Sequence, residues 1–209
     1  MKKMLPILLL LAGTAQAQMK PAPSGLTPAS HARSVADFQH DLNQEFKDPK
    51  ESPLSKQERK KLKSLPFYPA DFAYYVEARF VPDSTSLPFA METSTERRPM
   101  YRKFGELHFT LQGQELKLSI YQSQALLKRP GLEDYLFVPF TDLTNGHGSY
   151  GGGRYIDLRI PPKGATTMTL DFNRAYNPSC AYSAGYSCPV PPAENRLPVA
   201  IPAGVQHEH

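Results

Sequence analysis

From residue 74 onward, apolar side chains recur at every second position in short stretches, and this pattern most constrains the fold. The alternating stretches cover residues 74–80, 107–111, 116–120, 136–140, 156–160 and 168–172, and a last one at 197–201 could close the sheet. A period of two is typical of strands with one buried face, whereas an amphipathic helix has a period near 3.6. Short strands at close spacing predict a mainly β protein, with an antiparallel sandwich or a barrel-like sheet.

Turn-forming residues support the same fold class. Gln112-Gly113-Gln114 separates two alternating stretches and predicts a hairpin with glycine in its turn. The chain also has 21 prolines, which are excluded from helix interiors and from central strands. Many short elements joined by ordered loops are therefore expected, and the pattern does not separate a sandwich from a barrel.

Two short helices are expected before the strands. Ser34 can cap the first one, and the apolar residues Val35, Phe38, Leu42 and Phe46 then follow at helical spacing as far as Pro49. Ser55-Lys56-Gln57-Glu58 is a capping box, so a second helix is expected from Ser55 to about Leu65. Its basic run at residues 59–63 is expected to form a solvated helix face.

The N-terminus has the features of a cleavable signal peptide, residues 1–17. Lys2 and Lys3 precede an apolar run at residues 5–12, and small residues then permit cleavage between Ala17 and Gln18. The run is shorter than the roughly 20 apolar residues of a membrane-spanning helix, and no cysteine follows it for a lipid anchor. We therefore expect a periplasmic or secreted protein without stable membrane insertion after cleavage; the alternative is a buried N-terminal helix.

The remaining chain is expected to form one domain. Residues 18–33 are rich in proline and small polar residues and lack apolar periodicity, so a disordered leader is expected there. A single β-rich domain should follow at residues 34–205, with a tail at 206–209.

The charge of the chain argues against a nucleic-acid partner. Removal of residues 1–17 takes away two lysines, which leaves 22 basic and 20 acidic residues and a net charge of +2. Nucleic-acid binding proteins concentrate Lys and Arg on one face, and this chain shows no comparable cluster. The pI near 9.0 is therefore not read as a sign of DNA binding.

The two cysteines, Cys180 and Cys188, predict a disulfide that closes a tight loop. An even pair of cysteines in an exported protein is most simply oxidised. The alternative is a metal site, but the pair has no neighbouring histidine and extracellular zinc sites commonly need more ligands. We expect no metal and no cofactor.

Polar residues near the ends of the predicted strands are the candidate ligand-binding residues: Arg154, Tyr155, Asp171, Asn173, Tyr176, Asn177, Glu194 and Asn195. If three or four of them converge, they form the polar floor of an apolar pocket for a small polar ligand or a cell-envelope component. Asn and Tyr would bind neutral groups, and Arg could bind a carboxylate. The alternative is structural: Arg154 pairs with Asp171 or Glu194, and the Asn side chains cap turns.

Catalytic functions have weaker support, and whether the protein is an enzyme stays open. Asp171 and Glu194 could act as a carboxylate pair in an envelope glycan hydrolase if their carboxyl groups lie about 5–10 Å apart. His147, Asp142 and Asp157 could hold a metal, although none of the usual histidine spacings is present. Gly151 to Gly153 do not match a phosphate-binding loop. A third possibility is a purely structural or interaction protein.

The C-terminal motifs resemble a bacterial family known as domain of unknown function 1684 (DUF1684). The matching segments include Pro139-Phe140-Thr141-Asp142, Gly153-Arg154-Tyr155, residues 170–178, Cys180-Ala181-Tyr182 and Glu194-Asn195-Arg196-Leu197, and the resemblance extends back to residues 52–69. Two positions depart from the family pattern: Ser149 precedes Tyr150 in place of Thr, and Val205 replaces a glutamate. The resemblance implies the domain but no activity, and the Val205 difference puts any role of that glutamate in doubt.

Overall fold

The computed structural model describes residues 25–207. The expected signal peptide, with its cleavage site between Ala17 and Gln18, lies outside the described residues. Across the part of the chain that is described, no helix has the length and hydrophobicity needed to cross a membrane.

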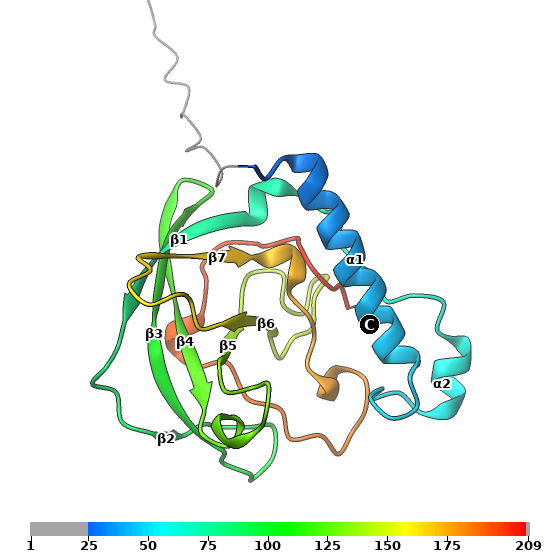
Figure 1. The fold of residues 1–209 in the computed structure, drawn as a ribbon. Helices are drawn as coiled ribbons and strands as arrows, with labels where there is room; N and C mark the ends of the chain where they lie inside the picture. The colour runs from blue at the N-terminus through cyan, green and yellow to red at the C-terminus, as the bar shows by residue number, and fades with distance from the viewer. Residues whose placement is uncertain (1–24, 208–209) are drawn as a thin grey trace, which may run out of the picture.

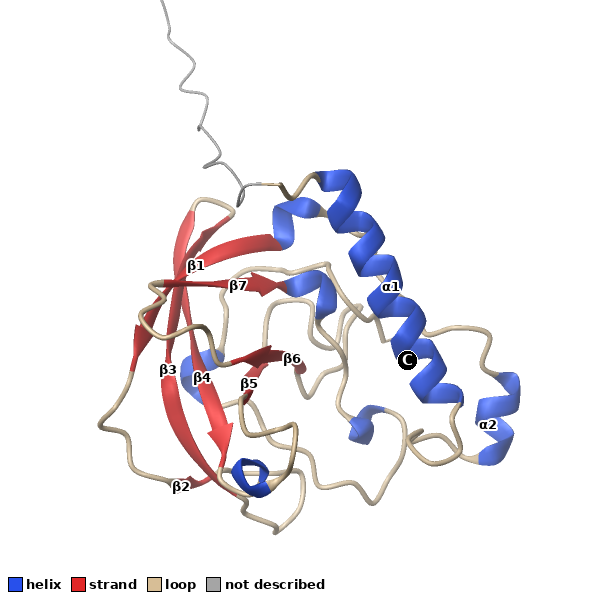
Figure 2. Cartoon of the chain, in the orientation of Figure 1, coloured by secondary structure: helices blue, strands red, loops and turns tan. Residues whose placement is uncertain are grey.

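The fold is one antiparallel sheet that curls into a half-barrel, which confirms the predicted mainly β class (Figures 1 and 2). Its strands are β1 (Tyr75–Pro82), β2 (Phe89–Ala90), β3 (Met100–Leu111), β4 (Gln114–Ser123), β5 (Tyr135–Phe140), β6 (Arg154–Arg159) and β7 (Thr167–Asp171). They pair in the order β6-β5-β4-β3-β1-β7, and β2 pairs with β3 outside this path. Strands β6 and β7 are therefore the two ends of the curled sheet.

The predicted hairpin is the longest pairing in the sheet. Strands β3 and β4 remain in register from Tyr101 opposite Ser123 to Leu111 opposite Gln114, with one shift between Lys103 and Gly105. The turn between them needs positive φ at both central residues, and Gln112 has φ 52° and Gly113 φ 74°. Gly113 therefore has a backbone conformation that residues with a β-carbon rarely adopt.

The main core fills the concave side of the sheet. It contains residues from both ends of the sheet, such as Ile156 on β6 and Leu170 on β7, together with Leu118 and Ile120 in the middle. Because these residues form one contiguous cluster, the sheet must curl around them. Leu197, Val199 and Ile201 are also buried in this core.

Residues 197–201 do not form the additional strand that their alternation suggested. Leu197 donates its N–H to the Thr141 carbonyl and Val199 accepts from the Leu143 N–H, but no continuous ladder follows. Pro198 inside the segment and Pro202 directly after it lack an N–H and so cannot donate to a ladder. The apolar alternation therefore correctly predicted burial and wrongly predicted pairing.

A second, aromatic cluster covers the opposite, outer face of β4 to β6. It contains Met91, Tyr121, Phe137 and Tyr155, with Tyr101, Tyr135 and Tyr176 packed against them. Neighbouring residues in a strand point to opposite faces, so Phe137 and Tyr155 point outward while the adjacent Val138 and Ile156 enter the core. Strand β5 is consequently buried on both faces.

The first helix, α1 (Pro28–Lys47), begins seven residues earlier than predicted and is not short. Thr27, and not Ser34, is its N-cap: the Thr27 hydroxyl accepts from the Ser30 N–H at 3.1 Å. Pro28 lies at the first helical position, where its missing N–H leaves no hydrogen bond unmade. The expectation that residues 28–33 belong to a disordered leader is therefore wrong, because Pro28 begins the helix instead of disrupting it.

The second helix, α2 (Lys56–Lys61), has the predicted capping box between Ser55 and Glu58 and ends before Leu65. Figure 1 shows α1 on the side of the molecule away from β3 and β4, so the helices and the centre of the sheet lie on opposite sides of the core. Leu42 and Phe46 of α1 pack with Leu65 and Val205 in a separate small cluster.

Val205, at the position where the family pattern has glutamate, is an apolar core residue in this protein. Its side chain is fully buried, and its N–H donates to the Ala175 carbonyl at 2.8 Å. The preceding Gly204 has φ 81°, and a β-carbon there would lie 2.4 Å from the Ala175 carbonyl oxygen. The glycine is thus required for close backbone packing, whereas residue 205 stabilises the contact with α1.

Candidate functional site

The candidate site is an aromatic pocket on the outer face of β5 and β6, with a volume of about 430 Å³. The aromatic residues of its wall are Phe38, Phe46, Tyr101, Tyr135, Phe137, Tyr155, Tyr176 and Tyr186. Helix α1 and the segment from Pro178 to Pro189 form the remaining sides. A volume of this size is typical of pockets that hold a small molecule.

Neighbouring aromatic rings of the pocket wall pack edge to face. The Phe137 and Tyr155 rings lie 4.7 Å apart at 70°, and the Tyr155 and Tyr176 rings lie 5.8 Å apart at 86°. A two-residue antiparallel bridge holds Tyr176 beside β6: Tyr155 and Tyr176 exchange their backbone hydrogen bonds at 2.9 and 3.0 Å. The aromatic wall is therefore fixed by backbone pairing as well as by packing.

Asp157 is the central acidic residue of the pocket. It projects from β6 on the same face as Tyr155, and its Oδ1 accepts hydrogen bonds from the hydroxyls of Tyr135 and Tyr176, both at 2.7 Å. Loss of hydration among the surrounding rings raises the pKa of Asp157, although the two tyrosine hydrogen bonds and the nearby Arg159 oppose that shift. Asp157 nevertheless remains exposed to solvent where it lines the pocket, so solvent screening limits the size of this shift.

Two further carboxylates, those of Glu45 and Glu51, line the same pocket. Desolvation raises the pKa of Glu45, and repulsion by Glu51 and Asp157 raises it further. Among the described residues that line the pocket there is no Lys, Arg or His, and the salt bridges found within residues 25–207 involve none of the three carboxylates. The pocket therefore combines aromatic surface with negative charge that its own wall does not neutralise.

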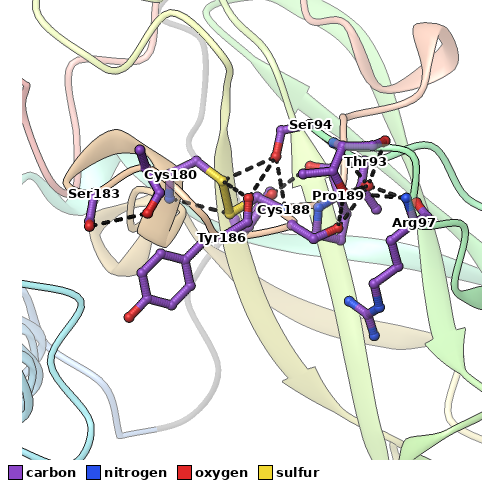
Figure 3. Close-up of a disulfide and its surroundings, with 12 residues drawn as sticks. Thr93, Ser94, Arg97, Cys180, Ser183, Tyr186, Cys188 and Pro189 are labelled. Carbon is purple, nitrogen blue, oxygen red and sulfur yellow. Dashed lines mark hydrogen bonds between the residues drawn. A yellow bond between two sulfur atoms is a disulfide. The ribbon is translucent and has the colours of Figure 1, made fainter.

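The disulfide between Cys180 and Cys188 shapes one side of the pocket, as predicted from the cysteine pair. Figure 3 shows Ser94 beside the disulfide, and the Ser94 hydroxyl lies 3.2 Å from both the Cys180 sulfur and the Tyr186 carbonyl. Ser94 N–H also donates to the Cys188 carbonyl at 2.8 Å. The loop that carries Tyr186 and Cys188 is thus attached to the segment after β2.

Three of the eight predicted ligand-binding residues line the pocket: Tyr155, Tyr176 and Asn177. Asn177 is almost fully buried, and its amide nitrogen donates to the Tyr182 hydroxyl and the Gln206 carbonyl, both at 3.1 Å. Its Oδ1 has no hydrogen-bond partner in the structure as described. Asn177 therefore combines a structural role with an acceptor that is left unpaired.

Arg154 is a structural residue and does not contribute to the pocket. It is fully buried on the core side of β6, where its Nη2 forms an ion pair with Asp142 at 2.7 Å and donates to the Ile201 carbonyl at 2.8 Å. The predicted structural alternative named Asp171 or Glu194 as its partner, and this is wrong. Asp142 is the partner because the loop after β5 brings it below the concave face of β6.

Asn195 and Asn173 also hold the fold together. The fully buried Asn195 side chain accepts from the Ser119 N–H at 2.7 Å and donates to the Ser119 and Pro139 carbonyls, so it links β4 with β5. Asn173 forms two 2.9 Å hydrogen bonds with the Asp71 backbone. It lies in a 3-10 turn after β7 and not on the strand, because the Asp171 side chain caps that turn.

Asp171 and Glu194, the residues of the possible hydrolase, have different surroundings. Asp171 is buried, with its Oδ2 3.0 Å from Nε2 of His31 and 3.5 Å from Nε of Arg174. Glu194 is exposed and accepts from the Tyr121 hydroxyl at 2.7 Å. Within the described residues they share no hydrogen-bond partner, and neither of them lines the aromatic pocket.

The possible metal ligands His147, Asp142 and Asp157 do not come together. Asp142 is occupied by Arg154, and Asp157 lies on the other face of the sheet. Over residues 25–207, no group of three His, Cys, Asp or Glu side chains is arranged to hold a metal ion.

Sequence reasoning missed most of the pocket wall. Tyr101 and Tyr135 are the outward residues of their strands, and Glu45 lies on α1 between the apolar positions that were recognised. One signal was available: Tyr135 and Phe137 of β5 and Tyr155 of β6 occupy outward positions, where a solvated face would carry polar residues.

Comparisons with known proteins place the chain in a family. Residues 60–206, well over half of the chain, match the model described as "Protein of unknown function (DUF1684)". The solution NMR structure of an uncharacterized protein from Haloarcula marismortui is similar, with 34% identity and a TM-score of 0.65 over 83% of this chain and 92% of that one. A search of curated proteins found no match. The chain therefore belongs to the DUF1684 family.

Proposed function

We propose that this protein binds a small organic cation, a molecule with an ammonium group, in the aromatic pocket. The observation that carries the proposal is the set of three carboxylates, Glu45, Glu51 and Asp157, in a pocket whose described wall has no basic side chain. All three carboxylates are exposed to solvent, so a cationic ligand that enters the pocket can pair with them. The proposal narrows the class of ligand expected from the sequence, a small polar molecule, to a small organic cation.

The aromatic rings support a cation over a neutral ligand. Ring faces carry partial negative charge, and a desolvated ammonium ion over a ring gains about 2 kcal/mol or more. The Tyr155 ring lies within 6 Å of both the Phe137 ring and the Tyr176 ring, so a compact ammonium group could contact more than one of them. Asp157, which is fixed by two tyrosine hydroxyls, would then supply the directional charge.

The test is calorimetric titration of the purified protein with tetramethylammonium, and with tert-butyl alcohol as a neutral probe of similar shape. We expect binding of the cation and none of the alcohol. Asp157→Asn keeps an acceptor for the tyrosines but removes the charge, and it should weaken binding at least tenfold, about 1.4 kcal/mol.

Glu45→Gln should weaken binding of the cation as well, and Glu77→Gln is the matched control. Glu77 is an exposed carboxylate on β1 that does not line the aromatic pocket. Equal affinity for the two probes, or equal affinity of Asp157→Asn and the unmodified protein, would overturn the proposal.

We also propose that the protein acts outside the cytoplasm, because residues 1–17 have the zones of a cleavable signal peptide in the required order. An oxidising compartment would maintain the Cys180–Cys188 disulfide. Mass spectrometry of the protein from fractionated cells should find Gln18 as the first residue. An intact N-terminus in the cytoplasmic fraction would contradict this assignment.

A further inference from the structure

A second cavity, of about 390 Å³, lies between the two end strands of the sheet and shares Asp157 with the aromatic pocket. Its polar and charged residues include Asp157 and Arg159 on β6, Thr169 and Asp171 on β7, His31 on α1, and Arg174. Helix α1 lines both cavities, with Phe38 and Glu45 in one and His31 and Ser34 in the other. The two cavities are therefore neighbours along the same helix.

The charge of the second cavity differs from that of the first. Its buried carboxylate, Asp171, already has partners, since Oδ2 lies near His31 and Arg174 and Oδ1 accepts from the Asn173 N–H at 3.1 Å. The two guanidinium groups, Arg159 and Arg174, retain donors beyond these contacts, because each guanidinium has five N–H groups. The second cavity thus provides hydrogen-bond donors where the first provides acceptors.

Arg159 is held only by a surface interaction. Its Nη1 pairs with Asp134 at 2.6 Å, where both side chains are 54% exposed, and also donates to the Gly131 carbonyl at 3.0 Å. Exposed pairs of this kind contribute about 1 kcal/mol or less, so a ligand can recruit the guanidinium at small cost. Arg174 is less free, because it donates to the Ser34 hydroxyl and stacks over the Phe38 ring at 5.7 Å.

The order of side chains along β6 places the two charges side by side. Tyr155, Asp157 and Arg159 alternate on one face of the strand, so each lies about 7 Å from the next. The aromatic ring, the carboxylate and the guanidinium therefore follow one another along the edge of the sheet, toward the second cavity.

We infer that the ligand is a zwitterion whose ammonium group occupies the aromatic pocket and whose carboxylate reaches across Asp157 to Arg159 and Arg174. This inference rests on the proposed cation-binding function and names the class of the cation. A guanidinium binds a carboxylate through two parallel hydrogen bonds. A doubly charged phosphate fits less well, because Asp157 and Asp171 lie next to the same two arginines.

The test compares three probes with the same head group: tetramethylammonium, (trimethylammonio)acetate and 4-(trimethylammonio)butanoate. Titration of the purified protein should give the tightest binding for the butanoate, at least tenfold tighter than for tetramethylammonium. The acetate is expected in between or weaker, because its short chain leaves the carboxylate near Asp157 and short of Arg159.

Arg159→Gln should reduce the affinity for the butanoate to that for tetramethylammonium, and should leave the latter equal or slightly higher. Arg174→Gln should act in the same direction, and Arg196→Gln, an exposed arginine outside both cavities, is the matched control. Thermal unfolding checks that each variant is folded. If Arg174→Gln does not fold, the Arg159→Gln result decides alone.

The outcomes separate the two proposals. If none of the three probes binds, the cation-binding function fails and the zwitterion with it. If tetramethylammonium binds but the butanoate binds no tighter, or Arg159→Gln leaves the butanoate affinity unchanged, only the zwitterion inference is overturned.

Discussion

The carboxylates of Asp142 and Asp157 lie on opposite faces of the sheet and have different partners. Asp142 lies in the interior, where Arg154 neutralises it and Thr144 and Ile201 N–H groups donate to it. Asp157 lies on the outer face of the same strand pair, hydrogen-bonded by two tyrosines but without a salt bridge to any described residue. The charge of Asp142 is neutralised by Arg154, whereas no described side chain forms a salt bridge with Asp157.

This contrast divides the polar motif residues by role. Arg154, Asn173 and Asn195 are buried and hydrogen-bond to groups of the fold, so their side chains are closed to a ligand even though Arg154 Nε has no hydrogen-bond partner in the structure as described. Tyr155 and Tyr176 present rings to a cavity that remains acidic. A residue type common in binding sites is thus not evidence of binding until its partners are known.

The largest expected effect is on the interior carboxylate. Arg154→Met should reduce the free energy of unfolding by about 3–5 kcal/mol, because it leaves the Asp142 charge buried without a partner. Chemical denaturation measures the loss. The double variant Arg154→Met with Asp142→Asn should recover part of it, and a loss below 1 kcal/mol in the single variant would contradict the structural role of the pair.

An intermediate effect is expected at Asn195. Asn195→Ala should cost about 1–3 kcal/mol, because it strips the Ser119 N–H and the Pro139 carbonyl of their buried partners. Gln114→Ala, at the exposed first residue of β4, serves as the control in the same denaturation series. Because Asn195 holds the fold together and does not line the pocket, folded Asn195→Ala protein should bind tetramethylammonium with unchanged affinity.

The smallest effect on stability is expected at Asp157, and its sign is opposite. A carboxyl pKa that is raised in the folded state contributes stability below the unfolded pKa, here about 3.8, and that stability is lost as pH rises through the folded pKa. Asparagine does not titrate, so Asp157→Asn does not lose this stability. The free energy of unfolding of the variant should therefore rise relative to that of the unmodified protein as pH increases above 4. Parallel denaturation curves at each pH measure the difference.

The same titration should control ligand binding in the unmodified protein. Deprotonation of Asp157 and Glu45 creates the negative site, so affinity for tetramethylammonium should rise with pH above the ordinary carboxyl range of 3.8–4.5. Calorimetry across this window provides the check. A flat affinity profile together with a pH-independent stability difference would show that Asp157 is not desolvated as described.

The sheet could be predicted from the sequence, and the pocket largely could not. The period of two located β1 and β3 to β7 because burial on the concave face imposes that spacing at every strand. The pocket combines Glu45 from α1, Tyr101 from β3 and Asp157 from β6, and no local pattern records which of these strands and helices become neighbours. Tyr155, Tyr176 and Asn177 were found because the motifs at strand ends concentrate them near one edge.

The helix start was missed for a different reason. Residues 28–33 carry few apolar side chains, so periodicity gave no signal, yet His31 is buried against Asp171 and against the rings of Phe72 and Tyr75. Only the position of Pro28 after Thr27 marked the boundary, and a proline is ambiguous between a loop and a first helical turn.

The pairing of His31 with Asp171 has a consequence for the order of assembly. The two residues are 140 positions apart, and they connect the first described helix with the last strand of the sheet. During synthesis α1 emerges before residues 155–178, which form the surface that it covers. The helix can therefore dock only after those residues have been synthesised. Closure of so long a loop makes helix docking a late event, so both cavities come into being only when nearly the whole chain is in place. A chain that stalls before residue 155 would contain the β3–β4 hairpin but neither cavity.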